Sequence, residues 1–257
     1  MSELFFERAE FIIPMIEKKT DYGRVLIGEK TELFAEAVHL VESERQKKMR
    51  THFSWALTGG NTPQEFYDWC VRTSALPEAL AAHTNFFVSD ERHVPLNSDQ
   101  SNFGNAERRL LVPYEVPTEH RHPWFVAYPP EEAAEAFRRT AMIVLGPGRG
   151  FDVCFLGMGD DAHTASFFPG NPDWQKPTDL LFDAYNTTRG WRLTITTAGL
   201  RASRNIVVMT VGAGKAQALK RVIAGPYDPA NTPAQILKMC AANVTWLVDP
   251  AAASLLE

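Results

Sequence analysis

One short segment, residues 152–170, combines the residue types that acid–base chemistry requires. It reads DVCFLGMGDDAHTASFFPG, an apolar run that leads into a glycine-rich turn with two aspartates and one histidine. A histidine exchanges protons near neutral pH, so His163 is a candidate general base. Asp161, two residues earlier, is a candidate for orienting its imidazole. A strand-to-helix turn with solvated acids is the alternative interpretation of the same residues.

Polar or glycine-rich segments follow four predicted strands. The strands are residues 53–57, 85–88, 152–156 and 206–211, and the segments that follow them are 58–63, 89–92, 157–163 and 212–215. In open parallel sheets, ligands bind in the crevice beyond the carboxyl ends of the strands. We therefore expect the four segments to face one crevice.

The first of these segments, TGGNTP, has the features of an anion-binding helix start. We predict that Thr62 caps a helix, with Pro63 in the first turn and Glu65 completing a capping box. Gly59 and Gly60 would leave backbone N–H groups exposed there, and such groups favour phosphate. A plain strand-to-helix turn is the alternative.

Three basic residues are candidates for binding an anionic substrate. Lys215 follows the last glycine-rich turn, although a solvated lysine at a helix start would look the same. Arg92 could contact a substrate or pair with the two acidic residues before it. Arg192 begins a predicted strand and could equally lie on the surface.

Signatures of nucleotide, metal and serine-nucleophile sites are weak or missing. The last glycine-rich turn is no P-loop, because Met209 and Ala216 occupy two of the defining positions. Residues 157–162 fit a loose dinucleotide fingerprint, but two aspartates stand where a pyrophosphate would approach. His120 and His122 have no third ligand at suitable spacing, and G-x-S-x-G is absent. We expect no metal and no cofactor.

Composition and charge exclude several classes of protein. Of 257 residues, 45% are hydrophobic and 22% charged, and the formal net charge of -5 argues against general nucleic-acid binding. No apolar run approaches the roughly 20 residues of a membrane span, and residues 1–11 lack the apolar core of a signal peptide. Cys70, Cys154 and Cys240 are scattered and odd in number, as in proteins with reduced thiols. We predict a cytoplasmic protein that binds neither nucleic acid nor membrane.

Strand-like and helix-like segments alternate along the chain without a clear linker. Further strands are predicted at residues 192–196 and 244–248, and helices at 31–41, 102–111, 130–145 and 213–223. This alternation predicts an α/β fold in which helices cover a mostly parallel sheet. We expect a single domain over residues 1–257.

Five blocks of the sequence, in this order and spacing, resemble the 6-phosphogluconolactonase family, which is related to the glucosamine-6-phosphate deaminases. They are TGGNTP (58–63), SDERHVPLNSDQSN (89–102), LGMGDDAHTASFFPG (156–170), RLTIT (192–196) and VGAGKAQAL (211–219). The resemblance implies a modified Rossmann-type domain of the glucosamine-6-phosphate deaminase/ribose-5-phosphate isomerase kind, without a dinucleotide and with helices on both faces of the sheet. It also implies hydrolysis of 6-phospho-D-glucono-1,5-lactone in the oxidative pentose phosphate pathway.

The same resemblance implies a set of site residues and partners. The catalytic candidates are His163, Asp161 and Asp90, and the substrate- or phosphate-binding candidates are Gly59, Gly60, Asn61, Thr62, Arg92, Arg192 and Lys215. A small phosphosugar lactone is the expected partner, with no metal and no cofactor. We expect a monomer or a weak homodimer.

Two residues separate the lactonase interpretation from a deaminase. Deaminases of this superfamily typically carry a glutamate five residues after the histidine, where this chain has Phe168, and a tyrosine where it has Arg92. A non-catalytic sugar-phosphate-binding protein is the other alternative, although such a protein would more often have lost the histidine. The chain departs from the family pattern at Asp160 and Ala162, which replace a usual proline and glycine. Asn61 also replaces a serine.

Overall fold

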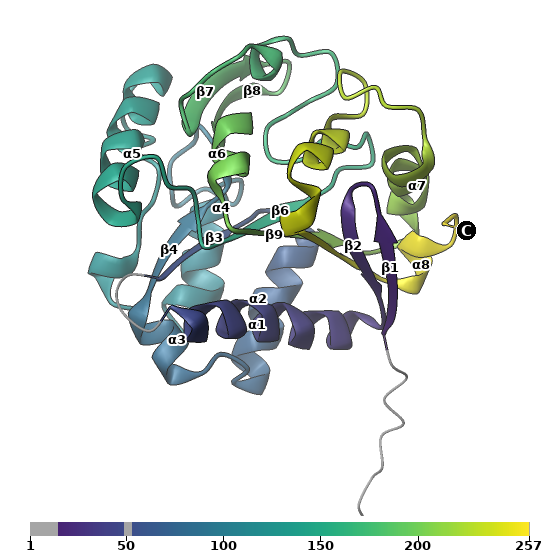
Figure 1. Ribbon diagram of the computed structural model, residues 1–257. Helices are drawn as coiled ribbons and strands as arrows, with labels where there is room; N and C mark the ends of the chain where they lie inside the picture. Colours follow the sequence, from purple (N-terminus) through teal and green to yellow (C-terminus); the bar gives the residue numbers. More distant parts are fainter. Residues whose placement is uncertain (1–14, 49–52, 257) are drawn as a thin grey trace, which may run out of the picture.

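The computed structural model describes residues 15–48 and 53–256, and a seven-stranded sheet runs through its centre (Figure 1). In spatial order the strands are β1 (Ile16–Thr20), β2 (Gly23–Ile27), β10 (Val244–Val248), β9 (Asn205–Thr210), β6 (Val153–Gly157), β3 (Phe53–Leu57) and β4 (Thr84–Val88). All are parallel except β1, the antiparallel edge partner of β2. The predicted mostly parallel sheet is confirmed. The prediction about a signal peptide concerns residues that lie outside this description.

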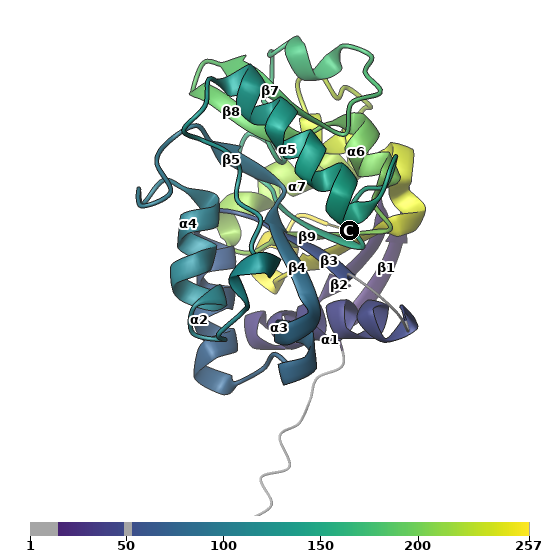
Figure 2. The same cartoon turned by 90° about the vertical axis from the view of Figure 1, so that its left-hand side faces the viewer.

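Helices cover both faces of this sheet. The α-helices are α1 (Lys30–Lys47), α2 (Asn61–Thr73), α3 (Glu78–His83), α4 (Asn102–Ala106), α5 (Pro130–Leu145), α6 (Thr197–Ala202), α7 (Ala216–Ala224) and α8 (Pro250–Ala253). A π-helical turn, η1 (Glu107–Leu111), continues α4, and 3-10 segments occupy η2 (Thr118–His120), η3 (Asp173–Gln175), η4 (Ala213–Lys215) and η5 (Pro233–Asn243). Figures 1 and 2 show α1, α2 and α3 on one face and α5 and α6 on the other.

Most residues of the central strands are apolar, as expected where helices cover both faces of a parallel sheet. Every residue of β3 and β4 is buried. On α1, the residues predicted to face the core are buried as well, namely Leu33, Phe34, Ala37, Val38 and Val41. Among the helices of the described ranges, none is both long and apolar enough to cross a membrane.

A second, three-stranded antiparallel sheet lies beside α5. It consists of β5 (Asp90–Arg92), β8 (Gly190–Ile195) and β7 (Phe182–Thr187), in that order. The strand predicted at 192–196 therefore belongs to this small sheet and not to the parallel one. The physical reason is the connection: a tight turn joins β7 to β8, and a turn that short cannot form the crossover that parallel pairing needs.

The start of α2 differs from the predicted capping box. The helix begins at Asn61, and its N-cap is Gly60 with φ 107°. Gly60 makes the turn that leads from β3 into the helix, so Thr62 already lies inside the first helical turn. Glu65 forms an ion pair with Lys30 at 2.7 Å instead of completing a box. The predicted cap at Thr62 is wrong.

The order of the strands opens a crevice beyond the carboxyl ends of the parallel strands. From β3 the chain continues outward to β4, whereas from β6 it continues the other way, to β9 and β10. Loops after β3 and β6 therefore diverge although the two strands are neighbours. Ligands of such sheets bind at this switch point.

Candidate active site

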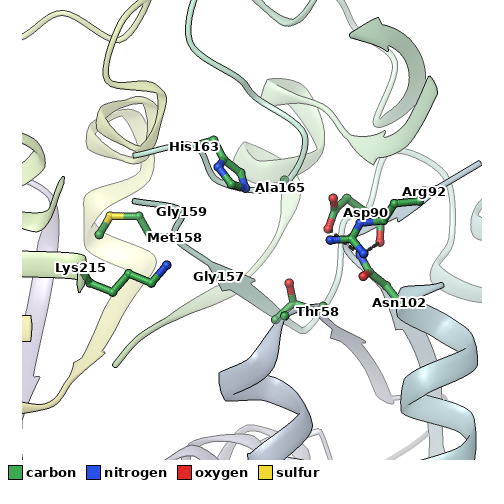
Figure 3. A pocket seen from close by; sticks show the side chains of 12 residues that line it. Thr58, Asp90, Arg92, Asn102, Gly157, Met158, Gly159, His163, Ala165 and Lys215 are labelled. Carbon is green, nitrogen blue, oxygen red and sulfur yellow. Dashed lines mark hydrogen bonds between the residues drawn. The ribbon is translucent and has the colours of Figure 1, made fainter. Parts of the chain in front are cut away.

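A polar cavity of about 210 Å³ occupies this switch point (Figure 3). Its lining comes from the segments after β3, β4, β6 and β9 and from the start of α4, and comprises Thr58, Gly59, Gly60, Asp90, Arg92, Asn102, Gly157, Met158, Gly159, His163, Ala165 and Lys215. The four segments predicted to share a crevice do share one. In Figure 3 Lys215 enters from one side, Asp90 and Arg92 from the opposite side, and His163 between them. Of the predicted site residues, Asn61, Thr62, Asp161 and Arg192 are not part of this lining.

The His163 imidazole is held by Asp161. The ring nitrogen Nδ1 lies 2.5 Å from Asp161 Oδ1, and the His163 backbone N–H donates to the same oxygen at 3.1 Å. An ionised carboxylate can only accept, so the neutral ring carries its proton on Nδ1 and keeps the Nε2 lone pair for a proton from outside. The hydrogen bond with His163 holds the pKa of the Asp161 carboxyl well below its usual value. This pair is built to present a basic nitrogen.

Gly159 makes room for that pair. A Cβ at this position would lie 2.0 Å from His163 Nδ1 and 2.6 Å from Asp161 Oδ1. Its N–H donates to the His163 carbonyl at 2.9 Å, which closes the loop on itself. Any larger residue at this position would displace the imidazole.

The loop that carries His163 contains backbone in the left-handed region. Ala162 has φ 65° and is fully buried, and Ala165 has φ 45°. A non-glycine residue costs roughly 1–2 kcal/mol in this conformation. The alanine that replaces the usual glycine at 162 therefore sits where backbone strain was expected.

Asp90 lies in the opposite wall and is fixed by hydrogen bonds. Ser166 Oγ donates to Asp90 Oδ2 at 2.9 Å, and Asn102 Nδ2 donates to the Asp90 carbonyl at 2.8 Å. Asn102 also explains a glycine: a Cβ on Gly59 would lie 1.8 Å from Asn102 Oδ1. Asn102 was not among the predicted site residues, although it ends the second block of the family resemblance.

Two of the predicted cations face the cavity, and both have protein partners. Lys215 Nζ lies 2.6 Å from Asp160 Oδ1, an acid whose side chain is 73% exposed. Arg92 Nη1 donates to the Gln100 carbonyl at 2.7 Å, so its guanidinium is held by a loop and not by Asp90 or Glu91. The chain thus places a positive charge on either side of His163.

Arg192 belongs to β8 of the small sheet and does not line the cavity. It is directly opposite Arg92 in the β5–β8 register, and its Nη1 donates to the carbonyls of Arg189 and Trp191. Burial lowers the pKa of the Arg192 guanidinium, and the neighbouring Arg92 lowers it further. A direct role in binding substrate stays a prediction for Arg192.

Arg189 was not among the predicted site residues. It lies in the turn between β7 and β8, and its Nη2 donates to Asp161 Oδ2 at 2.8 Å. No sequence pattern predicts this contact, because it joins two loops 28 positions apart.

The described part of the chain contains no group of three or more His, Cys, Asp or Glu side chains that could hold a metal ion.

Comparisons with known proteins place the chain in a family. A sequence model described as glucosamine-6-phosphate isomerases/6-phosphogluconolactonase matches residues 28–246. The chain belongs to this family. The resemblance predicted from five blocks is thereby confirmed.

Individual members of the family are similar over most of the chain. A 6-phosphogluconolactonase of Synechocystis sp. is 32% identical over 199 residues, which span 76% of this chain and 80% of that protein. The solved 6-phosphogluconolactonase of Trypanosoma brucei is 27% identical, with a TM-score of 0.77 over 94% of this chain and 100% of that one. A solved monomeric glucosamine-6-phosphate deaminase is 19% identical, with a TM-score of 0.72 over 90% of this chain and 99% of that one. This last likeness concerns the fold alone.

The Asp161 contacts predict a pH-dependent contribution to stability. Because the folded-state pKa of Asp161 is lowered, its contribution is fully present above the unfolded value of about 3.9. It is lost as the pH falls through the folded value. The urea midpoint of the wild type should therefore exceed that of Asp161→Asn at pH 5, and the difference should shrink towards pH 2.5. The exposed Asp179→Asn is the control, and a difference that does not change with pH would contradict the assignment.

Proposed function

We propose that this chain hydrolyses 6-phospho-D-glucono-1,5-lactone to 6-phospho-D-gluconate, a step of the oxidative pentose phosphate pathway. The observation that carries the proposal is the common cavity of His163, Lys215 and Arg92, in which one basic nitrogen lies between two cations. A δ-lactone has an activated carbonyl, so its hydrolysis needs a proton acceptor and anion-binding groups. The named lactonases among the relatives support the same reaction.

In the first step, His163 Nε2 takes a proton from a water molecule as the water oxygen attacks C1 of the lactone. Asp161 stabilises the imidazolium that results, because its carboxylate already accepts from Nδ1. In the second step, the tetrahedral intermediate collapses, the bond from C1 to the ring oxygen breaks, and the imidazolium returns its proton to that oxygen. The histidine ends the cycle neutral, and the product carboxyl ionises in water.

The phosphate of the substrate fits the side of the cavity that holds Lys215 and the start of α2. No side chain within the described residues caps α2, so its first N–H groups remain available to an anion. Gly59 and Gly60 allow a ligand to approach this backbone, and Asn61 and Thr62 follow in the first turn. This assignment leaves Arg92 on the opposite side, near Asp90, for the oxyanion that develops on C1.

The deaminase alternative lacks a proton-transferring group where it needs one. Phe168 is buried, and its ring centroid lies 4.7 Å from that of His163. A phenyl ring cannot exchange protons, so the chain has an apolar wall at the position of the deaminase glutamate. A non-catalytic binding protein would not need the His163–Asp161 pair.

We also propose a cytoplasmic location, since all three cysteines are free and buried. A monomer or weak homodimer stays a prediction.

A coupled assay with freshly generated lactone tests this function. Product should form faster than in the enzyme-free control, and no ammonia should be released from glucosamine 6-phosphate. Replacing His163 with Ala should lower kcat by about 10²–10⁴-fold with a smaller change in KM. The exposed His39→Ala is a matched control that should keep the wild-type rate. Ammonia release, or near-normal turnover by His163→Ala, would overturn the proposal.

Asp160 is expected to weaken binding of the substrate phosphate. Its carboxylate pairs with Lys215 at 2.6 Å and adds negative charge beside the proposed phosphate position. Asp160→Asn should therefore lower KM by about two- to five-fold, the effect of an exposed ion pair worth up to about 1 kcal/mol, with little change in kcat. Asp173→Asn breaks a similar pair with Lys176 away from the cavity and should leave KM unchanged. A higher KM in Asp160→Asn would show that the acid helps to place Lys215 instead.

A further inference from the structure

Arg189 occupies a fixed turn above the His163 loop. The turn between β7 and β8 is closed by Thr187, whose hydroxyl donates to the Gly190 carbonyl at 2.7 Å and accepts from the Arg189 N–H at 3.1 Å. Arg192 Nη1 donates to the Arg189 carbonyl at 2.7 Å. The backbone that carries the Arg189 guanidinium is therefore anchored in the small sheet.

The guanidinium of Arg189 binds the carboxylate that holds His163. The two carboxylate oxygens of Asp161 have different partners: Oδ1 contacts the His163 ring, and Oδ2 accepts from Arg189 Nη2 at 2.8 Å. A carboxylate held at both oxygens cannot rotate away from the imidazole. Since this contact also places a positive charge next to Asp161, it offsets part of the negative charge that faces the ring.

A second contact links Arg189 to the same imidazole. Its guanidinium lies over the Phe168 ring, 4.7 Å from the centroid, and the Phe168 and His163 rings lie 4.7 Å apart at 37°. Arg189 therefore contacts both the group that binds Nδ1 and the ring that packs against the imidazole. A surface arginine paired with a single acid would make only one of these contacts.

We infer that Arg189 is a positioning residue for His163, which fixes the direction of Nε2 through Asp161 and Phe168. The inference rests on the function proposed above, in which a neutral His163 takes a proton from water. Arg189 itself does not line the cavity, so it acts through these two neighbours and not on the substrate. The half-exposed position of its side chain makes substitution compatible with folding.

Two measurements on Arg189→Met test this role. The first is an NMR titration of the His163 ring in the free protein, with the resonance assigned by its loss in His163→Gln. Without the nearby cation the titration midpoint should rise by about 0.3–1 pH unit. The second is the pH profile of kcat/KM, whose acid limb should move up by the same amount. We also expect kcat to fall about ten-fold, a typical loss when a residue that orients a functional group is replaced. KM should change less than two-fold.

Two further variants separate charge from a general effect of substitution. Arg189→Lys keeps the cation but loses the planar group over Phe168, so its titration midpoint should stay near the wild-type value while kcat falls. Arg139→Met breaks an exposed pair with Glu135 on α5, away from the cavity, and should change neither readout.

Two outcomes would overturn the inference. The first is an Arg189→Met protein with the wild-type midpoint and wild-type kcat. The second is a rise in KM alone, which would make Arg189 a substrate-binding residue. A wild type that fails to hydrolyse the lactone would refute the proposed function, whereas the NMR titration would still decide the role of Arg189.

Discussion

Parallel pairing of β3 with β6 is the constraint on which the site depends. These neighbouring strands lead into loops that leave in opposite directions, and a crevice forms between the two loops. Apart from Gly157 at the end of β6, the residues of both strands are buried, and the strands form a rigid base for the polar segments. The acid–base pair and the two cations come from different loops. They meet because the carboxyl ends of the preceding parallel strands lie at the same end of the sheet.

Close packing in the loops then sets the positions of individual groups. Gly159 lies against the Asp161–His163 pair, and Gly59 lies against Asn102, at distances that no larger residue could accept. The left-handed backbone at Ala162 shows that the chain accepts strain to form this loop. A site assembled in this way depends on shape, and its acid–base chemistry follows from where the shape places one imidazole.

The sequence predicted the elements whose signals are local. The bounds of β3, α5 and β10 match the predicted segments, because short apolar strands and a Gly-terminated helix have strong patterns. It failed where the structure depends on distant partners. The edge hairpin β1–β2 and strands β5 and β7 were not predicted, and neither was the contact of Arg189 with Asp161, which two separate loops create. The cap at Thr62 was misplaced because Gly60 makes the turn into α2 with a positive φ, and the sequence does not show which of two glycines takes that conformation.

A crystal structure of the complex with 6-phosphogluconate, the proposed product, tests the central claim most directly. The account predicts that the C1 carboxylate lies within hydrogen-bond distance of His163 Nε2, with the phosphate between Lys215 and the first turn of α2. A ligand bound with its phosphate at His163 and its carboxylate at Lys215, or bound outside this cavity, would contradict it.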